Sequence, residues 1–124
     1  MIGRQARTTR EVFEDHLQKR KEGRVEDDIR ENYAENIVMM TRLGIFTGHD
    51  GVRQTASNLE RFLPGATFEY VDKQVEGEYA YLGWTGTSPE GVVRDGVDGF
   101  VIRDGKIVAQ FIHYTVDGKG EQGS

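Results

Sequence analysis

The strongest constraint on the fold lies in the last third of the chain, where residues 91–116 read GVVRDGVDGFVIRDGKIVAQFIHYTV. Two runs rich in β-branched residues flank the triplet Arg103-Asp104-Gly105. An Asp-Gly step between such runs is typical of a tight antiparallel hairpin, because glycine adopts the positive φ that the turn requires. We therefore expect a long β-hairpin to close the fold.

Both faces of this hairpin carry apolar side chains, with Val93, Val97 and Val101 on one face and Phe100 and Ile102 on the other. A sheet needs two apolar faces only if both are covered. We expect helices on the face of Phe100 and Ile102. The opposite face would be an exposed apolar patch in a monomer, so a homodimer through this outer face is expected.

The helices are expected before the hairpin. Thr8 and Glu11 have the spacing of a capping box at the start of a helix over about residues 9–22. His16 falls inside the apolar stripe of this helix, whereas Lys19 is expected to face water.

A second, acidic helix follows, in which Val25, Ile29 and Tyr33 repeat every four residues. Its acidic run at 26–28 is interpreted as a solvated helix face that complements the helix dipole.

A third helix is expected over about residues 50–63, and Thr47 with Asp50 has the pattern of another capping box. The remaining segments have the composition of strands and turns. The expected strands outside the hairpin cover residues 37–41, 67–75 and 79–87.

Helices that mostly precede the strands predict an α+β fold. A strongly bent sheet wrapped on the long first helix would leave a cone whose open end is a pocket. A length of 124 residues suits one domain. We expect this domain over residues 1–117, followed by a small, polar and flexible tail at 118–124.

Composition excludes several functions. The chain has no cysteine, so neither a disulfide nor a thiolate metal site is available. A net charge of −5 with scattered basic residues argues against nucleic-acid binding. No long apolar run indicates a secretion signal or a membrane span, so a cytoplasmic protein without membrane contact is expected. His49 lacks partners at a zinc-like spacing, and no metal site and no cofactor are expected.

The hairpin places one acid, Asp98, on the same face as Phe100 and Ile102. Burial there raises the pKa of a carboxyl group, and we expect Asp98 to stay protonated and to donate a hydrogen bond to a ligand carbonyl. His16 is the expected catalytic partner of Asp98, since a neutral imidazole exchanges protons near pH 7. The alternative is that the two side chains only bond each other, or a water, to fill a polar gap in the core.

The turn decides which other residues join Asp98. A three-residue loop pairs Asp98 with Gln110 and puts Ile112 and Tyr114 on the same face, whereas a two-residue turn pairs it with Phe111 and brings in His113. We favour the first register, in which His113 lies on the outer face. The expected ligand pocket is lined by Tyr33, Trp84, Phe100, Gln110, Ile112 and Tyr114. Plain core packing is the alternative role for Trp84 and Tyr33.

Four segments resemble the nuclear transport factor 2-like superfamily, in particular its SnoaL-like branch. They read ENYAENIV from residue 31, TGHDGVR from 47, LGWTGT from 82 and VDGFVIRDGKIV from 97. The resemblance covers essentially the whole chain. It implies a cone of three helices on a strongly curved, mainly antiparallel mixed sheet, as in ketosteroid isomerases and polyketide cyclases.

Compared with the isomerases, Asp98 matches the buried acid that donates to an oxyanion, and His16 matches their tyrosine donor. Thr41 stands near the position of their proton-shuttling aspartate, and the last strand has no carboxylate where cyclases would hold their base. The resemblance thus implies a donor and acid pair without the usual base.

Two function classes remain open on this basis. The first is cofactor-free acid–base chemistry, such as isomerisation, cyclisation or hydration, on a small apolar carbonyl compound. The second is a catalytically silent, dimeric ligand-binding or accessory domain.

Overall fold

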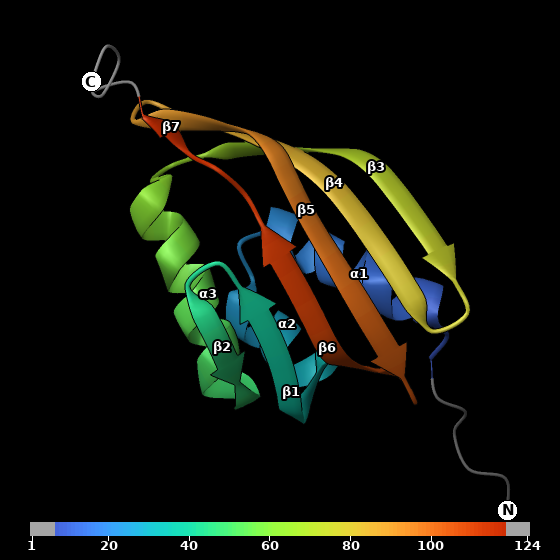
Figure 1. Cartoon of the computed structure of the whole chain (residues 1–124). Helices are drawn as coiled ribbons and strands as arrows, with labels where there is room; N and C mark the ends of the chain where they lie inside the picture. Colours follow the sequence, from blue (N-terminus) through green and yellow to red (C-terminus); the bar gives the residue numbers. More distant parts are fainter. Residues whose placement is uncertain (1–6, 119–124) are drawn as a thin grey trace, which may run out of the picture.

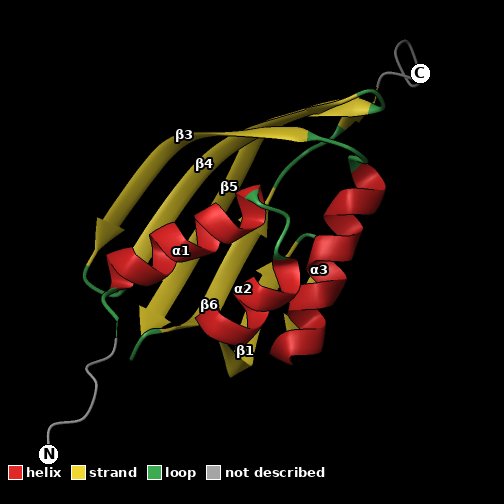
Figure 2. Cartoon of the chain, turned by 180° about the vertical axis from the view of Figure 1, so that it is seen from behind, coloured by secondary structure: helices red, strands yellow, loops and turns green. Residues whose placement is uncertain are grey.

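The computed structural model describes residues 7–118 as three helices packed on one face of a strongly curved sheet (Figure 1 and Figure 2). This confirms the α+β cone expected from the sequence. The helices are α1 (Thr9–Lys21), α2 (Val25–Asn32) and α3 (Gly48–Phe62). The strands are β1 (Tyr33–Thr41), β2 (Gly44–Thr47), β3 (Thr67–Glu76), β4 (Tyr79–Ser88), β5 (Gly91–Arg103), β6 (Lys106–His113) and β7 (Asp117–Gly118).

The sheet has the strand order β2-β1-β6-β5-β4-β3, and β7 pairs with β5. Only β1 and β6 run parallel among the paired strands described, so the sheet is mixed and mainly antiparallel. Figure 2 shows α1 crossing the concave side of β3, β4 and β5, with α3 beside β1. The helices therefore leave the opposite, outer face of the sheet uncovered within one chain.

The first helix begins where the sequence predicts. Thr8 and Glu11 form the complete capping box, with Thr8 Oγ1 accepting from Glu11 N at 3.1 Å and Glu11 Oε1 accepting from Thr8 N at 2.8 Å. Lys19 was expected to face water, and this was wrong. Its side chain is buried because its ammonium lies 2.6 Å from Asp15 and 3.0 Å from Glu31, which compensate its charge.

The second helix is shorter than its apolar repeat indicates. It ends at Asn32, and Tyr33 is the first residue of β1 rather than part of the helix. The acidic run is also not uniformly solvated. Glu26 is exposed, but Asp28 is fully buried against α1, where cationic and amide groups compensate its charge.

The third helix starts at Gly48, two residues earlier than expected. Thr47 occupies the N-cap but makes no side-chain capping bond, so the second capping box is not formed. None of the three helices has the length and apolar content needed to cross a membrane.

The C-terminal hairpin has a two-residue turn, since Arg103 pairs with Lys106 and both Asp104 (φ 53°) and Gly105 (φ 79°) have positive φ. The register then shifts by one at Val108, which has no partner on β5. Asp98 consequently pairs with Ile112. Both expected registers, with Gln110 or with Phe111 opposite Asp98, were wrong because neither includes a bulge at Val108.

The bulge nevertheless restores the expected face. Gln110, Ile112 and Tyr114 point to the concave side with Asp98, and His113 lies opposite Val97 on the outer side.

A second bulge lies between β4 and β5, where the pairing moves from Trp84 with Gly96 to Gly86 with Val93. Here β5 supplies one residue more than β4, so the alternation of its side chains changes side. Val93 is therefore buried in the core and does not belong to the outer face on which it was expected.

The core lies between α1, α2 and the concave side of the sheet. It is built from Val12 and Phe13 of α1, Ile29 of α2, and strand residues that include Ile37 and Phe100. Of the expected tail at 118–124, Gly118 belongs to β7, and 119–124 lie outside the described residues.

Candidate functional site

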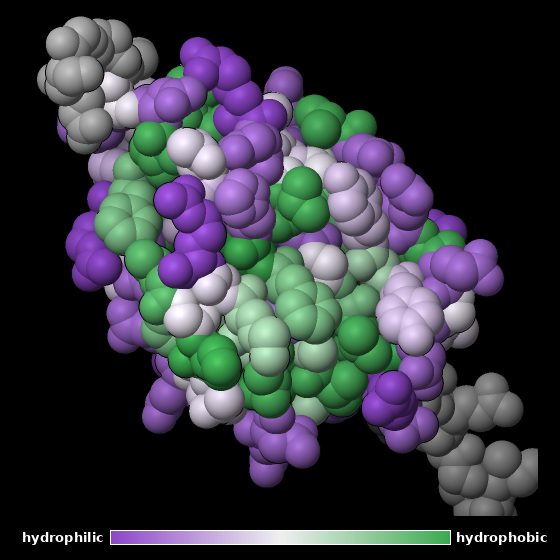
Figure 3. All heavy atoms as spheres, in the orientation of Figure 1, coloured by the Kyte–Doolittle hydropathy of each residue, from purple (hydrophilic) through white to green (hydrophobic). Residues whose placement is uncertain are grey.

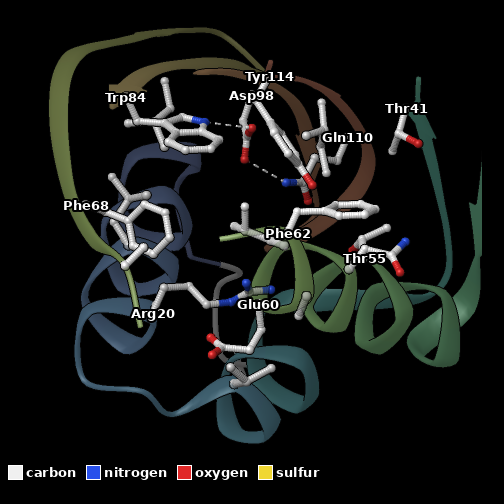
Figure 4. A pocket seen from close by; sticks show the side chains of 18 of the residues that line it. Arg20, Thr41, Thr55, Glu60, Phe62, Phe68, Trp84, Asp98, Gln110 and Tyr114 are labelled. Atoms are coloured by element: carbon white, nitrogen blue, oxygen red, sulfur yellow. Dashed lines mark hydrogen bonds between the residues drawn. The ribbon is translucent and has the colours of Figure 1, made fainter. Parts of the chain in front are cut away.

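A cavity of about 810 Å³ opens between the concave side of the sheet and the helices (Figure 4). Its walls come from α1, α3 and the inward side chains of β3 to β6. Most of these side chains are apolar or aromatic, among them Leu17, Leu59, Phe68 and Ile112. Such a cavity suits a small ligand held mainly by apolar contact and oriented by a few polar groups.

Asp98 points into this cavity from the middle of β5 (Figure 4). Its carboxyl group accepts hydrogen bonds from Trp84 Nε1 and from Gln110 Nε2, each at 3.2 Å. Burial raises the pKa of Asp98, and the bonds from Trp84 and Gln110 and the more distant charges of His16 and Arg20 only partly oppose this shift. The carboxyl group is thus favoured in its protonated, donating form.

Trp84 reaches Asp98 because a glycine faces it on the next strand. Gly96 pairs with Trp84, and a Cβ atom at Gly96 would lie 2.3 Å from two atoms of the indole ring. Phe68 and Tyr114 hold the ring from two further sides, with centroids 5.6 Å away in each case. The indole therefore lies flat against the β5 backbone with its N–H directed at Asp98.

Gln110 is fixed from behind by Tyr33, whose hydroxyl donates to Gln110 Oε1 at 2.6 Å. This bond orients the amide so that Nε2 faces Asp98. Burial raises the pKa of Tyr33, so the phenol remains a donor. The result is a continuous chain of hydrogen bonds from Tyr33 through Gln110 to the carboxyl of Asp98.

His16 does not contact Asp98 through a hydrogen bond; its Nδ1 lies 2.8 Å from Asp28 Oδ2. The direct pair expected from the sequence is thus replaced by a His16–Asp28 pair. The reason is the fold of α2, which brings Asp28 against α1 with Arg20 Nε at 2.7 Å and Asn32 Nδ2 at 2.8 Å. Burial opposes ionisation of Asp28, but His16, Arg20 and Asn32 together lower its pKa to about 2.

The second ring nitrogen of His16 is available to a ligand. Nε2 makes no hydrogen bond within the described residues. Asn32 Oδ1 is the only fully buried side-chain nitrogen or oxygen atom without a partner there, so Nε2 must reach open space. The space that His16 lines is the cavity, and the ring is held in place by Tyr33 and Phe100.

Six of the eight residues expected at the site line the cavity, namely His16, Asp98, Trp84, Gln110, Ile112 and Tyr114. Tyr33 and Phe100 do not. Both lie buried behind the cavity wall, where Tyr33 orients Gln110 and Phe100 packs edge-on against Phe13 and His16.

The analysis of the sequence missed Arg20 and Asp28. Arg20 is one helical turn after His16, and that i+4 spacing puts both side chains on one face of α1. Asp28 lies with Val25, Ile29 and Asn32 at the spacing of one helix face, which was the available signal.

The arrangement offers a hydrogen-bond donor, an imidazole and a guanidinium around one apolar space. It is suited to bind and polarise a carbonyl oxygen and to move a proton on the adjoining carbon. Within residues 7–118 no three His, Cys, Asp or Glu side chains gather as metal ligands would.

Comparison with known proteins supports a family assignment. Residues 10–110 match the family model of the SnoaL-like domain. No curated protein matches the chain. Solved structures with the same fold include an NTF-2 like protein of unknown function from Burkholderia xenovorans, with 19% identity, a TM-score of 0.71 and coverage of 86% of this chain and 82% of that one.

A Kribbella flavida protein provisionally assigned as a ketosteroid isomerase has 15% identity and a TM-score of 0.71 over 86% of this chain and 77% of its own. TerC, co-crystallised with polyporic acid, has 13% identity and a TM-score of 0.70 over 86% of this chain and 91% of its own. At these identities the likeness establishes the fold alone.

Proposed function

This chain belongs to the SnoaL-like domain family, and from that membership we propose that it binds a small, mainly apolar carbonyl compound in the cavity, with protonated Asp98 donating a hydrogen bond to the carbonyl oxygen. The observation that carries this proposal is the carboxyl of Asp98 at the wall of an apolar cavity, bonded only by the neutral donors Trp84 and Gln110. An ionised carboxylate there would need a directly paired cation, and neither donor supplies one.

The same geometry supports acid–base chemistry without a cofactor. With the carbonyl oxygen on Asp98, Nε2 of His16 removes a proton from the carbon beside the carbonyl. Electron density moves onto the oxygen, where the hydrogen bond from Asp98 strengthens. If the ligand has a double bond next to that carbon, return of the proton from His16 to the far end of the double bond moves the double bond and completes an isomerisation. Asp28 holds Nδ1 of His16 and stabilises the imidazolium while it lasts.

A catalytically silent binding role is the second candidate. Thr41 lines the cavity near the position where the isomerases carry a carboxylate base, and a hydroxyl group cannot replace that base. A protein that uses Asp98 only to orient a ligand would need no base at all. The fold of TerC, which has been co-crystallised with polyporic acid, is compatible with either role.

Binding can be followed through Trp84, the only tryptophan of the chain. We expect 2-acetylnaphthalene to quench its fluorescence, and Asp98→Leu to weaken that binding about tenfold through loss of one hydrogen bond. The matched ligand 2-ethylnaphthalene, which has no carbonyl, should bind both proteins equally. Equal affinity of the two proteins for the ketone would contradict the proposal.

Catalysis can be tested by deuterium exchange into the acetyl group of the same ketone, measured by NMR. We expect exchange faster than with free imidazole at the same concentration, and loss of the effect in His16→Gln. His113→Gln is the matched control, since His113 lies on the outer face. Binding without accelerated exchange would support the silent role.

We also propose a homodimer through the outer face of the sheet. Figure 3 shows apolar side chains gathered on this face. Pairing across the strands aligns Ile45 of β2, Met40 of β1 and Phe111 of β6 in one row. All three are at least 47% exposed within one chain, which supports a second copy as their cover.

A further inference from the structure

We infer that the ligand of this cavity carries an anionic oxygen in addition to its carbonyl group, and that the guanidinium of Arg20 binds this oxygen. The inference rests on the proposed function and names the class of ligand, an apolar body bearing a carbonyl and a carboxylate or ionised enol. Arg20 is the specificity-determining residue in this arrangement.

The position of Arg20 is the first argument. It lines the cavity from α1 and approaches in Figure 4 from the side opposite Asp98. Only its Nε donates to Asp28. Neither Nη atom makes a hydrogen bond within the described residues. An arginine has five N–H donors in a fixed plane, so four remain for a ligand in the cavity.

Asp28 fixes the guanidinium of Arg20 through one nitrogen only and leaves both Nη atoms available. Oδ2 of Asp28 is shared between Arg20 Nε and His16 Nδ1, and Oδ1 accepts from Asn32. The carboxylate therefore has three hydrogen-bond partners, and only one of them is a nitrogen of Arg20. Its bond to Nε fixes the plane of the guanidinium and leaves the Nη edge free, as a preorganised anion site requires.

The charges of the cavity wall are the second argument. The whole chain has 16 basic and 21 acidic residues. The wall reverses this balance, with the three basic residues Arg20, Lys21 and Arg42 against the two acidic residues Glu60 and Asp98. A positive cavity in a negatively charged protein selects for an anionic ligand.

The other two cations of the wall are less suited to hold a ligand oxygen. Lys21 Nζ lies 5.5 Å from the centre of the Tyr70 ring, and Arg42 donates to the carbonyl of Tyr114 at 3.3 Å. Both side chains belong to exposed residues at the rim. Arg20 is the member of the group that is held at the wall by a buried carboxylate.

The test uses two ketones that differ only in an acidic group, 6-acetyl-2-naphthoate and its methyl ester, titrated against Trp84 fluorescence at pH 7. We expect the naphthoate to bind about tenfold more tightly than the ester, because two charge-assisted hydrogen bonds form. Arg20→Gln should remove this preference. Equal affinities in the unaltered protein, or a preference that persists in Arg20→Gln, would overturn the inference.

Arg24→Gln is the matched control. Arg24 is exposed, pairs with Glu22 and Asp27, and does not line the cavity, so its loss changes the net charge equally and leaves the cavity wall intact. If Arg20→Gln does not fold, NMR of protein with 15N-labelled arginine replaces it. The Nε–H signal of Arg20 should shift with the naphthoate and stay in place with the ester. Identical responses to the two ligands would refute a site at Arg20.

The two proposals fail in different ways. If the ester binds through Asp98 and the naphthoate binds no better, the anion site is wrong and the carbonyl site stands. If the naphthoate binds through Arg20 and Asp98→Leu changes neither affinity, the carbonyl site is wrong. If neither ligand binds, both proposals are rejected.

Discussion

At the scale of single residues, Asp28 and Asp98 show how surroundings decide the state of a buried carboxyl group. Asp28 has hydrogen bonds to His16, Arg20 and Asn32, and its pKa falls to about 2. Asp98 has only neutral direct donors, and burial raises its pKa. One aspartate therefore acts as a fixed charge that holds His16 and Arg20, and the other acts as a hydrogen-bond donor.

The raised pKa of Asp98 predicts a stability that falls with rising pH. The unfolded chain ionises this carboxyl near pH 3.8 and the folded chain only above that, so between the two values the unfolded state alone releases the proton. We expect the free energy of unfolding to decrease with pH through this window, and Asp98→Asn to remove the decrease. Urea unfolding from pH 4 to pH 8 measures this decrease. Asp72→Asn, on the exposed part of β3, is the control and should keep the decrease.

A 13C titration of the Asp98 carboxyl carbon provides an independent check of the same prediction. A pKa for Asp98 below the ordinary value near 3.9 would contradict it. So would an Asp98→Asn variant whose stability follows the same pH profile as the unaltered protein.

Asp28 predicts the opposite pH dependence, a stability that falls as the pH falls. Its folded pKa of about 2 against an ordinary 3.8 corresponds to about 2 kcal/mol, which is present above pH 3.8 and lost as the pH falls toward 2. We expect Asp28→Asn to unfold more easily at pH 7 by roughly 3 kcal/mol, because the guanidinium of Arg20 loses its counter-charge and the imidazole of His16 loses its charged partner. Between pH 3.8 and pH 2 the free energy of unfolding of Asp28→Asn should fall less steeply than that of the unaltered protein. Unchanged stability in urea at pH 7 would disprove this account.

The sequence identified Asp98 because an acid among Phe100 and Ile102 on a strand face breaks the apolar pattern. It did not identify Asp28, because the acidic run was interpreted as a solvated face, although Asp28 has the spacing of the buried face with Val25, Ile29 and Asn32. Its burial depends on how α2 packs against α1, which is a tertiary contact. For the same reason His16 was recognised as an inward residue and assigned the wrong partner.

At the scale of elements, the periodicity of the sequence located all three helices and the five longest strands, since a helix stripe and an alternating strand are local patterns. Neither the bulge in β6 nor the bulge in β5 was foreseen. Each adds one residue to one strand, and its position depends on the partner strand as much as on the sequence around Val108 or Gly96. The bulge in β6 places Gln110 on the concave face, from which a two-residue turn alone would have removed it. The bulge in β5 places Val93 in the core.

Gly96 gives a prediction for the β4–β5 pair. In Gly96→Ala the new methyl group would meet the Trp84 ring at 2.3 Å, so the indole must move and release Asp98. We expect a loss of about 1–3 kcal/mol in the free energy of unfolding and a red-shifted Trp84 emission. Gly99→Ala is the matched control on the same strand, since its nearest contact would be 3.8 Å away. Equal effects of the two substitutions would contradict the role of Gly96.

At the scale of the whole molecule, the curved sheet has one side filled by helices and the cavity, while none of the helices described between residues 7 and 118 covers its outer side (Figure 3). The outward row of Ile45, Met40 and Phe111 continues across Gly99 of β5 to Tyr81 of β4. A glycine in the middle makes the row shallow there. Such a self-complementary, apolar sheet surface suits pairing of two identical faces about a twofold axis.

We therefore predict that the chain is a dimer at micromolar concentration and that the double substitution Met40→Glu, Phe111→Glu makes it a monomer. Two carboxylates in the centre of the row would be desolvated on pairing, and the dissociation constant should rise at least about a hundredfold. Light scattering and sedimentation equilibrium measure the change. The control is Gln18→Glu, which adds a carboxylate at an exposed site on α1, on the helix side of the sheet, and should leave the dimer intact. If the unaltered chain scatters as a monomer, or if Gln18→Glu dissociates it as readily as the double substitution, the outer face is not the interface.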